Sequence, residues 1–290
     1  MFSRKATKAK RSGIKTFALI IPRFEDVDHS FYAEEILKGV GLSASRLRVD
    51  VLSHVTEKHD HHDWLNSKTI DPQYINGIIF ADIDNDTETL QKVIATGIPY
   101  IVLNNIFEEP INSIAVDNFK AAKEVIEYLI NLGHQKIAII TGDQKTQSGR
   151  FRLDGYKEAL AKHQIPVKKE YIKHGDFLRT PSRKATKELL DLPERPTAIF
   201  ACSDVMALEV LAEAKARSIV VPQELSVVGF DDNPINVHSS IKLTTVSQPL
   251  KEMGRLGLEK LSLICEGKIG IPVQALLSTM LVERESVAKI

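Results

Sequence analysis

Short, continuously apolar runs alternate with longer amphipathic stretches along almost the whole chain. A run such as GIIFA at 77–81 has no polar face, which is typical of a strand buried on both sides of a parallel sheet. The stretch 119–132 instead repeats its apolar residues at helical spacing, and Gly133 follows as a helix-ending glycine. The pattern predicts strands at 17–22, 48–54, 77–81, 100–104, 136–141, 171–174, 198–201, 225–230 and 244–247, and helices at 30–45, 87–96, 119–132, 150–163, 183–192, 205–217 and 252–266.

Alternation of buried strands with helices is expected of parallel sheets that are connected by right-handed crossovers. A single core usually stops growing near roughly 250–300 residues, and this chain has 290. The sequence therefore predicts an α/β fold of two doubly wound lobes. The short link at 114–116 and the helix 119–132 after it are expected to mark a hinge between them.

Polar residues follow many of the predicted strands at the point where each strand ends. Ligands of open parallel sheets bind beyond the carboxyl ends of the strands, so these residues together favour a polar binding site. For any one of them alone, capping a helix or stabilising a turn is the commoner role, and Asp204 is expected to cap the helix 205–217. The strand ends concerned are Asn104-Asn105, Thr141-Gly142-Asp143, Gly175-Asp176-Phe177, Cys202-Ser203-Asp204 and Asp231-Asp232.

The charges of the chain balance, with 38 Lys and Arg against 38 Asp and Glu, so its body has no overall attraction to nucleic acid or membranes. No apolar run approaches the roughly 20 residues of a membrane span. Cys202 and Cys265 form no CxxC pair, which fits a reducing, cytoplasmic compartment. The basic segment 1–16 precedes an apolar stretch too short for a signal peptide, so it is interpreted as a disordered tail or a linker that faces nucleic acid.

Motifs of catalytic chemistry are absent from the sequence. It has no G-x-G-x-x-G after the first strand, no phosphate-binding P-loop and no G-x-S-x-G elbow. The cluster His59–Asp63 (HDHHD) resembles a metal site, but consecutive side chains cannot all face one ion, so a solvated loop is predicted. Cys202 has no histidine near it in sequence and is expected to be a small buried thiol. We therefore expect no enzyme, no cofactor and no metal.

A family resemblance covers nearly the whole chain, from Lys15 to about Ser286. The chain resembles the effector-binding domain of the lactose/galactose repressor (LacI/GalR) family of bacterial transcription regulators. The resemblance is dense from Ser113 onward and looser between Val40 and Tyr74. It rests on the segments SIAVDNFKAAKEVIEYLINLGHQKIAIITGD, RFRLDGYKEAL, PTAIFACSDVMALEVL, VPQELSVVGFDDNPI, LTTVSQPLKEMGRLG and LVERES.

The resemblance implies a type I periplasmic-binding-protein-like fold, with two lobes joined by three crossovers. The N-terminal lobe would hold residues 17–117 and 249–277, and the C-terminal lobe 118–246 and 278–290. A small effector, a sugar or a nucleoside-like molecule, would bind between them. The protein would form a homodimer in which the effector alters the lobe arrangement, and with it the affinity for operator DNA.

The family's effector contacts transfer to residues at matching positions. Arg152 and Asp231 match the arginine and carboxylate that bind the effector, and Arg152 is expected to keep Asp231 charged. We hypothesise that Asp231 points into the cleft while Asp232 caps a helix or faces outward. Phe177 matches the aromatic residue that stacks on the ligand. The other matching positions are Ser203 and Gln248 as polar contacts, Phe31 and Tyr32 on the first helix, Asp117 at the lobe junction, and Asn104.

The sequence departs from the family pattern at two points. Asn104 stands where the family usually has aspartate, which alters hydroxyl recognition from the N-terminal lobe. The family's helix-turn-helix head is not in this chain, and ATKAKRSG replaces the hinge helix, so operator binding is expected only through a head absent from this chain. The alternatives are a solute-binding protein of a transporter, which the lack of an export signal disfavours, and a headless regulator with a protein effector.

Overall fold

The computed structural model of the chain describes residues 15–22, 31–56, 71, 73–83, 87–235 and 241–290. The predicted solvated loop at His59–Asp63 lies outside the described residues, as does all of the basic segment 1–16 except its last two residues. None of the helices in the described part is long and apolar enough to cross a membrane.

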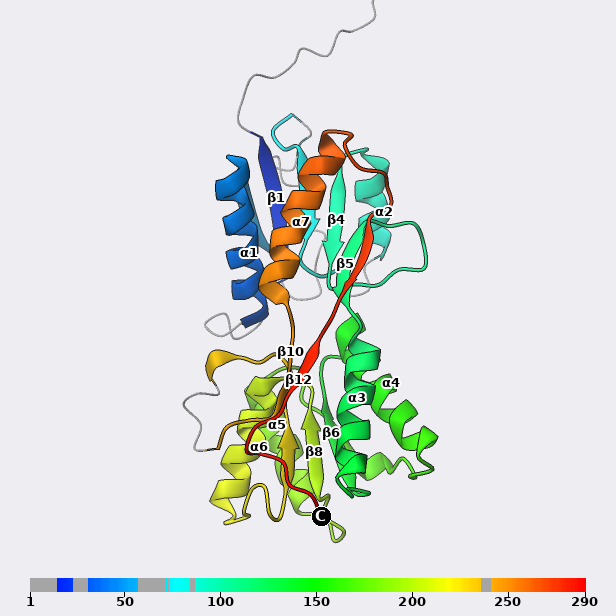
Figure 1. Cartoon of the computed structure of the whole chain (residues 1–290), viewed down its shortest axis with the longest axis vertical. Coiled ribbons are helices and arrows are strands. Elements are labelled where there is room, and N and C mark those ends of the chain that lie inside the picture. Colours follow the sequence, from blue (N-terminus) through cyan, green and yellow to red (C-terminus); the bar gives the residue numbers. More distant parts are fainter. Residues whose placement is uncertain (1–14, 23–30, 57–70, 72, 84–86, 236–240) are drawn as a thin grey trace, which may run out of the picture.

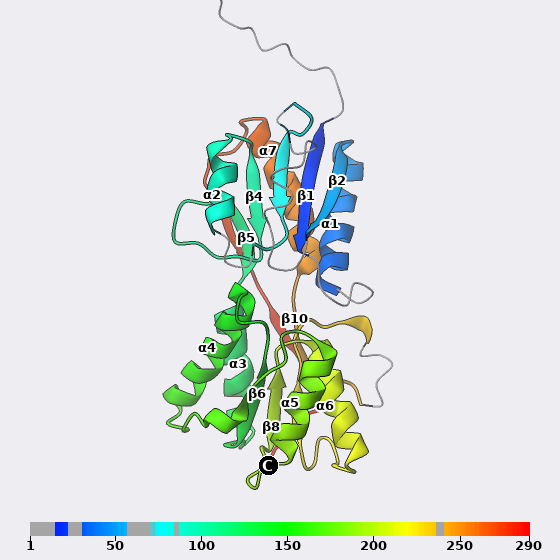
Figure 2. The ribbon, with the colours of Figure 1, turned by 180° about the vertical axis from the view of Figure 1, so that it is seen from behind.

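Six parallel strands form the first of two lobes, in the order β11-β5-β4-β3-β1-β2. Apolar side chains alternate between the two faces, so helices α1 and α7 cover one face and α2 covers the other (Figures 1 and 2). The elements of this first lobe are β1 (Thr16–Pro22), α1 (Phe31–Leu47), β2 (Asp50–Thr56), β3 (Gly77–Phe80), α2 (Thr87–Ala95), β4 (Tyr100–Leu103), β5 (Ser113–Val116), α7 (Leu250–Cys265) and β11 (Gln274–Leu277).

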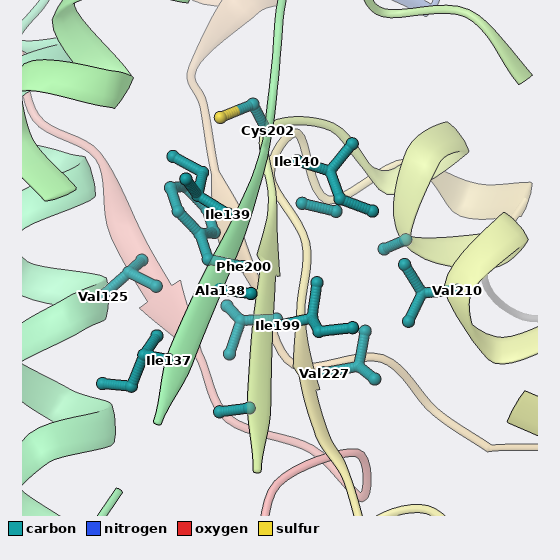
Figure 3. Packing of buried hydrophobic residues seen from close by; sticks show 14 of the residues in the cluster. Val125, Ile137, Ala138, Ile139, Ile140, Ile199, Phe200, Cys202, Val210 and Val227 are labelled. Carbon is teal, nitrogen blue, oxygen red and sulfur yellow. The ribbon is translucent and has the colours of Figure 1, made fainter. Parts of the chain in front are cut away.

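Four parallel strands form the second lobe, in the order β7-β6-β8-β9. Figure 3 shows Ile139 and Phe200 on the side of Val125, and Ile140 on the side of Val210, so both faces of this sheet are buried. The elements of this second lobe are α3 (Asn118–Asn131), β6 (Ile137–Thr141), α4 (Gln147–Lys162), β7 (Ile172–His174), α5 (Arg179–Leu190), β8 (Ala198–Ala201), α6 (Asp204–Ala216) and β9 (Ser226–Val228).

The chain passes between the lobes three times, from β5 to α3, from β10 (Thr245–Ser247) to α7, and from β11 to β12 (Met280–Val282). Strands β10 and β12 pair antiparallel beside the second sheet. The strands of both sheets run with their carboxyl ends toward the junction of the lobes (Figures 1 and 2). The predicted α/β fold with doubly wound parallel sheets is therefore confirmed.

Three strands differ from the sequence-based expectation. The predicted link at 114–116 is the inner strand β5, which pairs with both β4 and β11. Strands β11 and β12 were not predicted, because both are partly exposed and β11 alternates exposed with half-buried positions. A strand at the edge of a sheet is partly exposed, so it lacks the continuous apolar run by which a buried strand is predicted from sequence.

Helices α1 and α7 cross at very close range. The backbone of Gly39 lies against the Lys251 carbonyl, and the backbone of Gly254 lies against the Ile36 carbonyl. Near this crossing the Ser43 hydroxyl donates to the Arg255 carbonyl oxygen at 2.9 Å. Only residues without a side chain allow two helix backbones to approach this closely.

One side chain links the two lobes directly. Gln147, the first residue of α4, accepts a hydrogen bond from the Ile106 backbone N–H at 2.7 Å. Its Nε2 donates to the Ile106 carbonyl oxygen at 2.8 Å. Ile106 follows β4, so the pair of bonds joins the loop after a first-lobe strand to a second-lobe helix.

Candidate functional site

Arg152 is the central cation of the site and is only 4% exposed. It lies on α4, where its Nε donates to Asn118 Oδ1 at 2.8 Å and its Nη1 donates to the Cys202 carbonyl oxygen at 2.6 Å. The guanidinium carbon lies 3.6 Å from the ring centroid of Phe230 and 5.7 Å from that of Phe177. Burial lowers the pKa of Arg152, and the nearby charge of Asp231 opposes that shift. An arginine held this way is fixed in place and stacked on aromatic rings.

Asp231 follows β9 and forms a bridge with Ser247. Gln248 donates from Nε2 to Asp231 Oδ1 at 2.7 Å. Burial raises the pKa of Asp231 to about 6, although the charge of Arg152 and the Gln248 bond lower it. Desolvation of the carboxylate outweighs the attraction, but the charge of Arg152 still favours the ionised form of Asp231.

Asp232 has a different partner from its neighbour. Arg284 donates from Nη2 to Asp232 Oδ1 at 2.5 Å. Asp232 is partly exposed and pairs with this arginine, and it caps none of the described helices. Both aspartates have positive φ, +123° and +58°, so the backbone turns the two like charges toward separate cations. Such strained backbone is found mainly where the surrounding structure holds it at a functional site.

Phe177 stands at the end of β7 in another strained turn, with φ of +61° after +54° at Asp176. Its ring covers Gly142, which follows β6. A methyl group built on Gly142 would lie 2.0 Å from the Phe177 Cζ atom. The missing side chain at 142 is therefore what allows the aromatic ring to lie beside Arg152.

Replacement of Gly142 by alanine is expected to displace the Phe177 ring while the second lobe stays folded. The clash involves the far end of one side chain rather than backbone, so rotation of the ring relieves it. Near-ultraviolet circular dichroism and the fluorescence of a bound ligand would report the change. The double variant Gly142→Ala/Phe177→Ala should lose no more ligand affinity than Phe177→Ala alone. An additive loss of affinity would contradict the proposed contact.

The carboxyl ends of the first sheet contribute a second polar group. Asn104, which follows β4, donates from Nδ2 to Asp82 Oδ2 at 3.1 Å, and Asp82 follows β3. Tyr32 on α1 donates to the Ala81 carbonyl oxygen at 2.7 Å. Burial first, and then the charge of Asp82, raise the pKa of Tyr32 well above its usual value. Asn104 and Asp82 also have positive φ, +66° and +125°.

Ser203 and Asp204 mainly stabilise the start of α6 and the segments beside it. Ser203 is the N-cap of α6 and accepts from the Met206 backbone N–H at 3.3 Å. The expectation that Asp204 caps this helix is wrong, because Asp204 is the first helical residue. Its carboxylate instead accepts hydrogen bonds from Thr245 Oγ1 at 2.6 Å and from the Asn233 backbone N–H at 2.7 Å.

Asp117 and Phe31 lie at the edges of this arrangement. Asp117 caps α3 between the two lobes, where its Oδ1 accepts from the Lys120 backbone N–H at 2.8 Å. Phe31, the first residue of α1, packs against the apolar cluster under α1 and α7. Cys202 is fully buried, as expected, and burial raises the pKa of its thiol to about 12.

The structure brings the predicted residues into two groups. Arg152, Asp231, Phe177 and Gln248 form one group at the second sheet, and Asn104 and Tyr32 form the other at the first. Both groups follow the carboxyl ends of strands that run toward the junction of the lobes, and the charge of Asp82 acts on Arg152. The sequence-based reasoning missed Asp82, Phe230 and Asn118. Asp82 follows an apolar strand, so the strand-end rule used for the other positions would have found it.

This arrangement can bind a polar molecule. A guanidinium donates in a fixed fork, carboxylates accept pairs of hydroxyl groups, and an aromatic face covers C–H bonds. Within the described parts of the chain, no cluster of His, Cys, Asp and Glu side chains could hold a metal ion.

Known proteins resemble this chain in sequence and in fold. Residues 126–287 match the family described as "Periplasmic binding protein-like domain". The chain is 33% identical to the HTH-type transcriptional repressor CytR of Escherichia coli (strain K12) over 253 residues, 85% of this chain and 71% of CytR. It is 36% identical to the probable HTH-type transcriptional repressor ExuR of Bacillus subtilis (strain 168) over 243 residues, 82% of this chain and 70% of ExuR. The solved transcriptional regulator CelR–cellobiose complex superposes with a TM-score of 0.84 at 29% identity and covers 93% of this chain and 84% of that chain.

Proposed function

Because this chain belongs to the LacI family of transcriptional regulators, we propose that it senses a sugar or nucleoside-like effector bound between its two lobes. The observation that carries this proposal is the pair of facing polar groups, Arg152 with Asp231 and Gln248 on one side and Asn104 with Asp82 on the other. The relatives named above are transcriptional regulators, and the protein CelR has been solved with cellobiose. We propose that this chain likewise carries no catalytic activity.

The effector would act through the arrangement of the lobes. We propose lobe boundaries at 17–117 with 249–277 and at 118–246 with 278–290, so that each of the three connections can bend at the junction. A ligand that contacts both lobes favours the arrangement in which both contacts are made. In a homodimer this change would alter the spacing of two DNA-binding heads, and operator DNA would be bound only through such heads. The balanced charge of the chain supports a regulator whose body does not itself bind DNA, and we propose that this regulator is cytoplasmic.

Thermal unfolding of the purified chain against a panel of sugars and nucleosides tests this proposal. A ligand at a hundredfold its dissociation constant should stabilise the protein by about 2.7 kcal/mol, which is a shift of several degrees for a chain of this length. The shift should vanish in Asp231→Ala and persist in Asp154→Ala, which removes an exposed carboxylate from α4. If a folded, dimeric protein responds to no member of the panel, the proposed function is wrong.

A further inference from the structure

Each side of the site holds an amide paired with a carboxylate. Asn104 donates to Asp82 in the first lobe, and Gln248 donates to Asp231 beside the second sheet. A carboxylate can only accept, so each pairing fixes which end of the amide is the NH₂ group. The carbonyl oxygen of each amide must therefore point away from its carboxylate.

Both of these carbonyl oxygens are buried and have no hydrogen-bond partner within the described part of the protein: Asn104 Oδ1 and Gln248 Oε1. Asn104 as a whole is only 6% exposed. A buried acceptor without a partner destabilises the protein, because it has lost its hydrogen bonds to water. Two such acceptors on opposite sides of one site indicate that a bound molecule supplies their donors.

Charges of both signs act within the site. Arg152 is the central cation, and two of its nitrogen atoms already donate to the protein. Against it stand Asp82, Asp204 and Asp231, whose charges all act on Arg152. Asp204 accepts hydrogen bonds from Thr245 and Asn233, whereas Asp82 and Asp231 accept from the two amides.

We propose that the ligand is uncharged, that it donates hydrogen bonds to Asn104 Oδ1 from one end and to Gln248 Oε1 from the other, and that Asp82 makes the site reject carboxylate- or phosphate-bearing analogues. This inference rests on the proposed function and narrows its ligand class. A neutral ring with hydroxyl or amino groups supplies such donors. A carboxylate or phosphate at the same end has no proton to donate at neutral pH and meets the Asp82 carboxylate.

Asp82 is a positioning residue in this scheme, since it acts through Asn104. The Asp82 carboxylate lies at the end of β3, the strand that pairs with the one before Asn104. A negative charge therefore lies beside the amide, while the atom that Asn104 offers to the ligand is a neutral acceptor. Asp82 therefore contributes to specificity in addition to holding the amide in one orientation.

Calorimetric titration with matched neutral and anionic ligands tests the inference. The pairs are glucose and glucuronate, galactose and galacturonate, cellobiose and cellobionate, and uridine and uridine 5′-phosphate. The neutral member of the recognised pair should bind at least about 100-fold more tightly, because a like charge in a desolvated site costs several kcal/mol. In Asp82→Asn the Asn104 amide is free to turn, so this ratio should fall about tenfold or more. Glu108→Gln, which removes an exposed carboxylate from the loop after β4, should leave the ratio unchanged.

The outcomes separate this inference from the proposed function. An anionic member that binds as tightly as its neutral partner overturns the inference and leaves a small-molecule sensor intact. A ratio that is unchanged in Asp82→Asn, with that variant folded, overturns the role of Asp82. If no pair binds to the folded wild-type chain, both the proposed function and the inference fail.

Discussion

Replacement of Arg152 by alanine is expected to lower the free energy of unfolding by about 3–5 kcal/mol and to abolish ligand binding. Removal of one member of a buried charged network leaves the others without compensation. Asn118 Oδ1 and the Cys202 carbonyl oxygen would lose their donors, and Asp231 would lose the nearby positive charge. The pKa of Asp231 should then rise further above 6, since Arg152 is the largest influence that lowers it.

Urea unfolding at neutral pH measures the loss of stability, and calorimetry measures the loss of binding. Arg152→Lys keeps the charge but not the planar fork, so it should recover part of the stability and little of the binding. Lys157→Ala removes an exposed cation from the same helix and should change the free energy of unfolding by no more than about 0.5 kcal/mol. A loss below about 1 kcal/mol in Arg152→Ala, with unchanged affinity, would show that the guanidinium is not the centre of the site.

Replacement of Gly39 by alanine should destabilise the first lobe by about 3 kcal/mol or more. The new methyl group would lie 1.9 Å from the Lys251 carbonyl oxygen and 2.8 Å from the Arg255 backbone nitrogen. Both atoms belong to the backbone of α7, so no side chain can rotate to make room. The helices would have to separate, which would open the apolar cluster beneath them.

Gly41 provides the matched control on the same helix, because a methyl group there meets nothing within 4 Å. Gly41→Ala should therefore stabilise the protein by up to about 1 kcal/mol through helix propensity. Gly254→Ala should resemble Gly39→Ala, since its methyl group would lie 2.4 Å from the Ile36 carbonyl oxygen. Equal unfolding midpoints for Gly39→Ala and Gly41→Ala in urea would refute this account of the helix crossing.

The sequence predicts the fold well because most strands of both sheets are buried on both faces. A run such as 77–81 admits one interpretation, whereas β11 and β12 could not be found, because partial exposure breaks the apolar run that marks a buried strand. The first residues of helices are harder to predict from sequence for a different reason. Serine and aspartate are comparable N-caps, so the sequence Ser203-Asp204 alone could not show that the serine is the cap.

The site is predictable only in part. Position relative to a strand end indicates that Asn104 and Asp231 lie near the junction of the lobes. The position of a residue after a strand does not show which carboxylate pairs with which amide. Asp82 and Asn104 follow different strands and come into contact only when the sheet forms. The strained φ values at these positions are likewise a property of the folded chain rather than of residue type.

The Gln147–Ile106 contact has a consequence for how freely each position can vary between related proteins. Gln147 contributes its side chain, while Ile106 contributes only its peptide N–H and C=O groups. Any residue but proline can offer those two groups, so substitution at 106 leaves the contact in place. At 147 the side chain must carry both a donor and an acceptor at the full reach of glutamine, and the shorter asparagine falls short by one methylene. The contact between the lobes therefore restricts which residue can stand at 147, whereas almost any residue can stand at 106.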